Sequence, residues 1–347
     1  MDTQYEGGSK GDPVQITEDE AAVYDRQIRL WGLEAQQRIE LSLIECEMPP
    51  SWLSDCGGTA TEAIKNIVLA GIGKLVIYDS EEVKEEDLGA GFFFRDEDVG
   101  KKRVDAAKAR IEALNPLVTV QALRHPTILE QGSLEALVMS VDLVCVTDWD
   151  REALIKINDI CRQYGKPFYA GGTFGLLGYV FCDLLKHDFI SPDRSAPKEA
   201  PKNVKATASY PRLSMALQHR WTGLTKRQTK ELNPAVVHII LALWEYQHNH
   251  EGKLPDDIDA ASDLGQIANS ILATSDVNRQ VLTSVPLDLI DAMSTSAAHE
   301  FSPTCAVVGG ILAQDILKAL AAREAPIANF FTFDGNTGGG SVCRMNM

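Results

Sequence analysis

The chain has 347 residues, of which 45% are hydrophobic and 24% charged, as in a globular protein of one large or two modest domains. Its 49 Asp and Glu residues outnumber 33 Lys and Arg residues, for a formal net charge of −16. This acidic balance, without a basic stripe, excludes proteins that bind the nucleic-acid backbone. No apolar run reaches the roughly 18 residues of a membrane span. The polar N-terminus lacks the pattern of a signal peptide, so we expect a soluble intracellular protein with no membrane or nucleic-acid partner.

The first predicted helix follows a polar tail over residues 1–16 that has little to bury. Thr17 and Glu20 have the spacing of a capping box, which predicts that the helix begins at Thr17. Apolar residues then recur at helical spacing, and Gly32 is expected to interrupt the helix.

From residue 59 onward, helical patterns alternate with short apolar runs rich in β-branched residues. Such alternation indicates βαβ units. We therefore predict an α/β fold with a doubly wound, mostly parallel sheet. The predicted helices cover residues 59–73, 101–114 and 151–165, and the predicted strands cover 74–79, 118–123, 142–148, 167–172, 178–185 and 329–335.

The rhythm changes in the second half of the chain. Residues 187–210 carry prolines and charges and are predicted to be a solvated loop, whereas residues 211–300 are helical in character. Residues 302–324 begin with a proline in the first turn and are nearly all apolar, which predicts a buried central helix. The expected organisation is a tail over 1–16, an α/β domain over 17–190 and 300–347, and a loop plus helical insertion over 191–299.

The residues themselves offer few candidate catalytic or ligand-binding sites. The run DCGGTAT (55–61) precedes a helix as a phosphate-binding loop would, but Asp55 brings a negative charge to that place, so a plain glycine turn is favoured. The seven cysteines form no C-x-x-C pair, and we expect free, mostly buried thiols. His238 lies in an apolar helix and is expected to be a satisfied, partly buried histidine.

Five blocks of sequence together resemble one family. They are YDRQIRLWGLEAQQRI, EAIKNIVLAGIGKL, DLGAGFFF, CAVVGGILAQDILKAL and NFFTFDG. In these blocks, within residues 19–190 and 300–336, the chain resembles the smaller, non-thioester subunits of heterodimeric SUMO-activating enzymes. These subunits are relatives of ubiquitin-activating enzymes and of bacterial ThiF/MoeB adenylating enzymes. The resemblance implies a Rossmann-like adenylation fold that forms the pseudo-active half of a heterodimer.

The resemblance also implies which residues correspond to the nucleotide site of the competent partner. Asp79 stands where an acidic residue holds the ATP ribose, and Arg103 stands where a lysine holds the phosphates. Residues 89–91 read Gly-Ala-Gly where the competent pattern reads Asn-Arg-Gln, so this chain's own site is expected to be degenerate. Asp148 and Asp150 lie near the position of a magnesium aspartate, but neither is assigned to a metal. ATP and Mg²⁺ are expected to be bound mainly by the partner, and none tightly by this chain.

Arg26, in YDRQIRLWG, matches the family arginine that reaches across the interface to ATP in the partner's site. From the residues alone, a surface ion pair of Arg26 or Arg29 with Asp25 or Glu34 is the favoured interpretation. The resemblance reverses that order and makes Arg26 the one catalytic candidate of this chain.

The function implied is that of a regulatory subunit. With its larger partner it would support ATP-dependent adenylation of the C-terminal glycine of SUMO, before thioester transfer to a cysteine of the partner and, indirectly, to a SUMO-conjugating enzyme. The isolated chain is expected to be inactive, and residence in the nucleus, and also the cytoplasm, is implied. Alternatives are the regulatory subunit of a NEDD8-type activating enzyme, a stand-alone ThiF/MoeB-like adenylating enzyme or a dehydrogenase, and a pure scaffold.

One segment departs from the family pattern. Residues 40–56 replace a smooth apolar first strand and contain Pro49-Pro50, which a central parallel strand cannot accommodate. Residues 41–45 are predicted to form at most a partial strand, so the centre of the sheet is expected to be compromised. A genuine variant and an error in the gene structure both remain open from the sequence.

Overall fold

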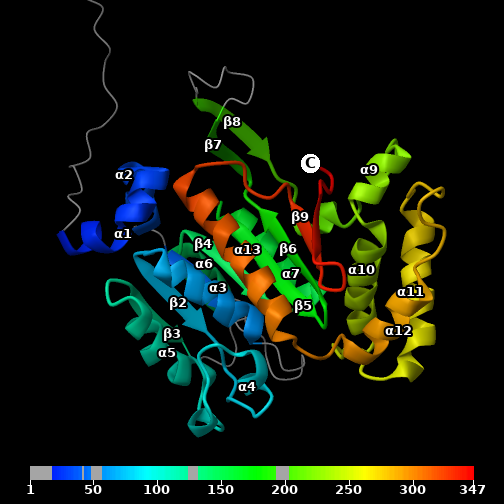
Figure 1. The fold of residues 1–347 in the computed structure, drawn as a ribbon, viewed down its shortest axis with the longest axis horizontal. Helices are drawn as coiled ribbons and strands as arrows, with labels where there is room; N and C mark the ends of the chain where they lie inside the picture. Colours follow the sequence, from blue (N-terminus) through cyan, green and yellow to red (C-terminus); the bar gives the residue numbers. More distant parts are fainter. Residues whose placement is uncertain (1–17, 41–42, 48–56, 124–131, 193–202) are drawn as a thin grey trace, which may run out of the picture.

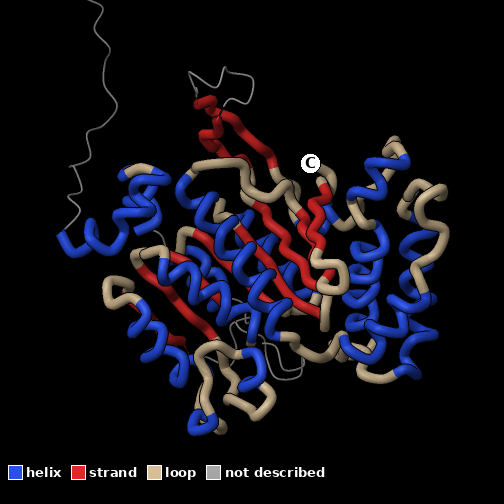
Figure 2. Tube along the Cα trace, viewed as in Figure 1, coloured by secondary structure: helices blue, strands red, loops and turns tan. Residues whose placement is uncertain are grey.

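The computed structural model describes residues 18–40, 43–47, 57–123, 132–192 and 203–347. It has one eight-stranded sheet covered by helices on both faces (Figures 1 and 2). Five neighbouring strands are parallel and three at one side are antiparallel, so the prediction of a doubly wound, mostly parallel sheet is confirmed. The order across the sheet is β10 (Gly339–Cys343), β9 (Phe330–Asp334), β6 (Leu177–Asp183), β5 (Phe168–Phe174), β4 (Leu143–Thr147), β1 (Leu43–Glu47), β2 (Lys74–Tyr78) and β3 (Thr119–Leu123).

Strand β1 lies in the middle of the parallel part, where a compromised strand was expected. It pairs in parallel with β2 from Leu43 to Glu47, and with β4 on its other side. The partial strand predicted over 41–45 is confirmed from Leu43 to Glu45, and the paired strand continues to Glu47; residues 41 and 42 lie outside the described residues. Pro49 and Pro50 come after Glu47 in the sequence and lie outside the described residues, so they remove no hydrogen bond from the described part of the ladder.

Two helical layers sandwich the sheet. One contains α2 (Leu33–Glu40), α3 (Gly58–Leu69), α5 (Arg103–Leu114) and α13 (Ser302–Ala321), and the other contains α6 (Ser133–Ser140), α7 (Arg151–Gln163) and α10 (Pro234–Asn249). Helix α1 (Glu18–Trp31) precedes α2 at the periphery of the molecule (Figure 1). Gly32 separates the two with φ +86°, a left-handed conformation that glycine adopts without strain, so the predicted interruption is confirmed.

Helix α13 is the buried central helix that the sequence predicts. Among the described residues it is the one helix long and apolar enough to cross a membrane, yet 61% of its most apolar window is buried inside the protein, as in a core helix. It packs closely on α3 and also contacts β5 and β6. The start of α13 therefore lies next to the start of α3, where the candidate site is found.

The prediction of a loop over 187–210 is wrong, because two strands cover much of this range. β7 (Lys186–Pro192) and β8 (Asn203–Ser209) form a separate antiparallel hairpin that projects from the body of the protein (Figure 1). The loop was predicted from prolines and charges that lie mostly between the two strands. Along the strands themselves, less exposed residues alternate with exposed ones, and Phe189 is buried. β10 was also not predicted, because its glycine-rich sequence carries a weak strand signal.

Residues 211–300 are helical as predicted, and the structure describes no strand within them. Their helices are α8 (Leu213–Ala216), α9 (Lys226–Glu231), α10, α11 (Ala261–Thr274) and α12 (Leu287–Ser296). Helix α10 covers the antiparallel part of the sheet, where the Trp244 ring meets the Tyr179 ring of β6 edge-on at a centroid distance of 4.8 Å. Trp244 is fully buried, so this helical region shares a hydrophobic core with the sheet.

Candidate functional site

The candidate site lies at the start of α3, beyond the carboxyl end of β1. In parallel α/β folds this is where ligands bind, because the first N–H groups of the helix have no partner within the helix and favour an anion. Here the backbone N–H of Gly58 donates to the Glu300 Oε1 atom at 2.9 Å. The residue before α3, Gly57, offers no side-chain cap. The start of α3 therefore carries a carboxyl group of the protein itself.

Glu300 is half-buried between the starts of α3 and α13. Cys305 Sγ lies 3.8 Å from its Oε1 atom, and its Oε2 atom is buried without a partner among the described residues. Burial raises the pKa of Glu300 to about 7, although the N–H groups of Gly58 and Gly57 act to lower it. A side chain at Gly58 would clash, since its Cβ would lie 2.9 Å from Cys305 Sγ and from Ala90 Cβ.

Asp148 and Asp150, which the sequence could not separate, have different roles. Asp148 has φ +58°, and its Oδ1 atom accepts the N–H of Thr173 at 2.9 Å. Burial and the nearby charge of Glu300 raise the pKa of Asp148 well above its ordinary value. Asp150 instead caps α7 by accepting the N–H of Ala153 at 2.9 Å. In the part of the chain that the structure describes, no three His, Cys, Asp or Glu residues are grouped so as to hold a metal ion.

The structure brings Asp79 and Arg103 together, as the predicted site requires, but adds a residue that the sequence reading missed. Arg103 donates from Nε and Nη2 to the two carboxylate oxygens of Asp87, at 2.9 and 2.7 Å. Its Nη1 atom lies 3.8 Å from Asp79, and all three side chains are buried. Burial raises the pKa of Asp79 to about 7, against the lowering effect of Arg103 and of the Glu81 N–H.

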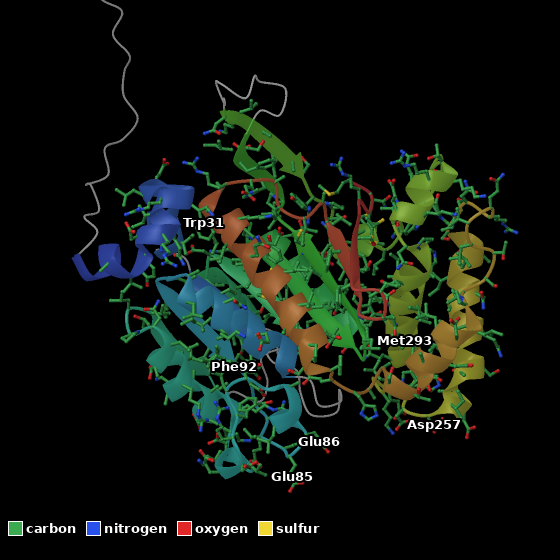
Figure 3. The ribbon with its side chains drawn as sticks, viewed as in Figure 1. Trp31, Glu85, Glu86, Phe92, Asp257 and Met293 are labelled. Atoms are coloured by element: carbon green, nitrogen blue, oxygen red, sulfur yellow. The ribbon has the colours of Figure 1, made fainter. Side chains whose placement is uncertain are left out.

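Asp87 opens α4 (Asp87–Ala90), the short helix of the block DLGAGFFF. Glu85 and Glu86 precede it at the outer edge of the molecule and are exposed, whereas Asp87 is fully buried (Figure 3). The signal that could have identified Asp87 is an acidic residue two positions before the run at 89–91, where the resemblance places the phosphate contacts. Because Asp87 accepts from both Nε and Nη2, the Arg103 guanidinium is already paired.

These residues do not fit a nucleoside triphosphate. A triphosphate needs unpaired donors at the helix start and on the basic side chain, and here Glu300 takes the first and Asp87 the second. Ala90 has no polar group to offer. Asp55, in the loop before α3, lies outside the described residues.

Arg26 lies far along the chain from this pocket, on the exposed surface of α1. Tyr24 anchors that helix: it is buried, and its hydroxyl accepts the Nδ2–H of Asn115 at 2.8 Å. Arg29 forms the surface ion pair with Asp25 at 3.0 Å, whereas Arg26 has no hydrogen bond or ion pair with any described residue. The pairing predicted from the residues alone is therefore made by Arg29.

The remaining sequence predictions concern packing. The cysteines whose side chains are described are buried and form no disulfide, as predicted: Cys145, Cys161, Cys182, Cys305 and Cys343. His238 is more deeply buried than predicted, and only one of its two ring nitrogens has a hydrogen-bond partner among the described residues. Its Nδ1 atom lies 2.7 Å from the carbonyl oxygen of Pro234, and its Nε2 atom has no partner among the described residues. Burial lowers its pKa.

The fold and the candidate site together define the class of protein to which the chain belongs. A doubly wound sheet with a glycine-initiated helix after β1 and a buried acidic residue after β2 is a nucleotide-binding type of α/β fold, here with its anion position filled from within. The ThiF family model matches residues 24–347, so the chain belongs to the ThiF family. 

Similar proteins agree with this membership. The chain is 34% identical to SUMO-activating enzyme subunit 1 of Rattus norvegicus, with 96% of each chain covered, and 33% identical to the protein of that name from Homo sapiens, with 94% and 95% covered. It is 32% identical to a DNA damage tolerance protein of Saccharomyces cerevisiae, with 93% and 96% covered. A crystal structure of E. coli MccB with succinimide has a TM-score of 0.54 at 13% identity, covering 93% of this chain and 71% of that chain, which shows a shared fold.

Proposed function

We propose that the chain is the regulatory, non-thioester subunit of a heterodimeric SUMO-activating enzyme. The observation that carries the proposal is similarity along nearly the whole chain to proteins named SUMO-activating enzyme subunit 1. The internally filled pocket supports the division of labour, because a subunit without its own nucleotide site needs a partner that has one. The larger partner would hold ATP, Mg²⁺ and the thioester cysteine, and the isolated chain would be inactive.

In this proposal, Arg26 acts in trans at the partner's ATP site. Adenylation joins the C-terminal carboxylate of the modifier to the α-phosphorus of ATP and releases pyrophosphate, and negative charge grows on the α-phosphate oxygens in the transition state. A guanidinium placed there stabilises that charge, and more strongly in a water-poor interface than in solution. The exposure of Arg26 and its freedom from partners among the described residues support this role.

The test is modifier-dependent exchange between ATP and pyrophosphate by the purified heterodimer. Arg26→Ala should lower the exchange rate by about 100-fold or more, as the loss of a charge-stabilising donor does. Arg29→Ala is the matched control: it removes an arginine of the same helix that is already paired with Asp25, and should leave exchange near the wild-type rate. Wild-type exchange by Arg26→Ala in an intact heterodimer would refute the assignment and favour a pure scaffold.

The alternatives differ in measurable ways. A NEDD8-type regulatory subunit would support exchange with NEDD8 and not with SUMO when paired with the corresponding partner. A stand-alone ThiF/MoeB-like enzyme would bind ATP tightly as an isolated chain, which the paired state of Arg103 argues against. We also propose that the subunit resides mainly in the nucleus with its partner and contacts the SUMO-conjugating enzyme only indirectly; imaging of a tagged chain and pull-downs with each protein test these points.

A further inference from the structure

We propose that a cavity between α9 and the C-terminal strand β10 binds an extended peptide segment that carries apolar and acidic side chains in alternation. The cavity shares no lining residue with the pocket at the start of α3, and its occupant is independent of the heterodimer and of Arg26.

The cavity has a volume of about 320 Å³, at the lower end of the range for ligand sites. It lies where the C-terminal segment runs beside α9 and α10 (Figure 1). Its apolar wall consists of Trp221, Leu224, Leu232, Val342 and Cys343. Within this wall Val342 is 40% exposed, so apolar surface is open to solvent here and available to a ligand.

Hydrogen bonds fix β10 against the helical region on either side of the cavity. Before the cavity residues of β10, the Ser341 hydroxyl donates to the carbonyl oxygen of Leu232 at 3.0 Å. After them, the backbone N–H of Asn346 donates to the Nδ1 atom of His219 at 3.2 Å. The cavity is therefore formed by segments that are already held in place, and a ligand has little of the protein left to order.

The rim of the cavity carries positive charge. Arg220 and Arg344 both line it and are exposed, and neither forms a salt bridge with a described residue. The one acidic residue in the described lining, Glu231, is paired with Arg227 of the same helix at 2.9 Å. On a chain with a net charge of −16, two unpaired guanidinium groups beside apolar surface favour a ligand that carries carboxylates, which guanidinium groups bind in bidentate fashion.

The position of β10 favours a peptide in extended conformation. β10 is the outermost strand of the sheet, and apart from its ladder with β9 its residues 340–343 make no backbone hydrogen bond with a described residue. An edge strand presents N–H and C=O groups to which an extended peptide can bond. Two separate arginines favour two acidic side chains within the peptide over a single terminal carboxylate.

The experiment measures binding of a dye-labelled, C-terminally amidated octapeptide of alternating isoleucine and glutamate to the full-length chain, by fluorescence anisotropy. We expect saturable binding, weakened by about tenfold or more in the double variant Arg220→Glu, Arg344→Glu. Both arginines are exposed, so this variant should fold. The matched control is Arg279→Glu. It reverses the charge of an exposed arginine in the same helical region that does not line the cavity, and should change the affinity by less than about twofold.

Three altered peptides separate the sources of affinity. Serine in place of isoleucine tests the apolar wall, and lysine in place of glutamate tests the charge; each should weaken binding by about tenfold or more. A peptide without glutamate but with a free C-terminal carboxylate should also bind more weakly than the original, because it offers one negative charge to two arginines.

Several results would overturn the proposal. They are the absence of saturable binding to the wild-type chain, equal affinities of the wild type and the double variant, and equal binding of the lysine peptide. Self-association of the chain that the double variant abolishes, without any binding of the peptide, would assign the cavity to a second copy of the chain and would overturn it as well.

Discussion

The contact between α13 and α3 provides a sharp test, because two adjacent glycines of α13 differ only in what faces them. A Cβ atom on Gly309 would lie 2.7 Å from the carbonyl oxygen of Thr59, 2.8 Å from Cβ of Glu62 and 3.0 Å from the backbone nitrogen of Ala63. Two of these three atoms belong to the α3 backbone and cannot move aside alone. A Cβ atom on Gly310 would meet nothing within 4 Å.

The two substitutions should therefore change stability with opposite signs. Replacing glycine by alanine inside a helix gains about 1 kcal/mol from helix propensity, so Gly310→Ala should stabilise the protein by up to about that amount. Gly309→Ala gains the same but forces α3 and α13 apart, and such overpacking costs about 1–3 kcal/mol. The net loss should reach up to about 2 kcal/mol, and the difference between the two variants isolates the clash because the propensity gain cancels.

Urea unfolding followed by circular dichroism measures both variants. We expect a lower midpoint for Gly309→Ala and a higher one for Gly310→Ala, with unchanged denaturant dependence. Equal shifts for both variants, or stabilisation by Gly309→Ala, would mean that the close approach of the two helices is not tight and would refute the reasoning. Because Glu300 and Gly58 lie at the starts of these same helices, Gly309→Ala should also weaken the contact between them.

Two further predictions concern the filled pocket. Arg103→Met leaves Asp87 and Asp79 buried without their cation and should lower the free energy of unfolding in urea by about 3–5 kcal/mol. The control is Arg227→Met, at an exposed arginine, which should change stability by less than about 0.5 kcal/mol. Similar effects of the two substitutions would contradict the buried pairing. Burial raises the pKa of Glu300 from 4.5 to about 7, so between these values the folded protein keeps a proton that the unfolded chain loses. The protonated Glu300 side chain therefore contributes fully to stability below pH 4.5. As the pH rises to 7, up to about 3 kcal/mol of the free energy of unfolding is lost. Glu300→Gln should remove that part of the slope, and equal slopes over this range would count against it.

Most of the fold could be predicted from the sequence because its strands and helices have strong local signals. The buried strands are short apolar runs, and the helix ends are marked by residues such as Gly32 and the proline that begins α13. The failures have local causes as well. The hairpin of β7 and β8 was missed because the prolines between its strands favoured a loop, and β1 was expected to be compromised because Pro49-Pro50 follow it in the sequence.

The site was harder to predict because its decisive contacts are long-range. Asp79 and Arg103 were identified through the family resemblance, and they lie close together because the connection between β2 and α5 folds back, with the Arg103 N–H donating to the Glu81 carbonyl oxygen at 3.0 Å. Glu300 was missed because nothing in its local sequence indicates that the starts of α3 and α13 meet. Asp87 was missed for a different reason: an acidic residue in a polar loop is normally solvated, and only the buried arginine beside it makes it structural.

The filled pocket illustrates why stability and nucleotide binding compete at one place. A competent site must keep a guanidinium or ammonium group and several backbone N–H groups unpaired until the nucleotide arrives, which leaves buried donors without partners. In this chain the Gly58 N–H is paired with Glu300 and the Arg103 guanidinium with Asp87, so these donors are satisfied without a ligand and are not available to a phosphate. In the proposed heterodimer such internal pairing is tolerable, because the partner would supply the nucleotide site. The proposed role of Arg26 fits that condition, because its side chain lies on the exposed surface of α1 and needs nothing from the pocket that the chain has closed.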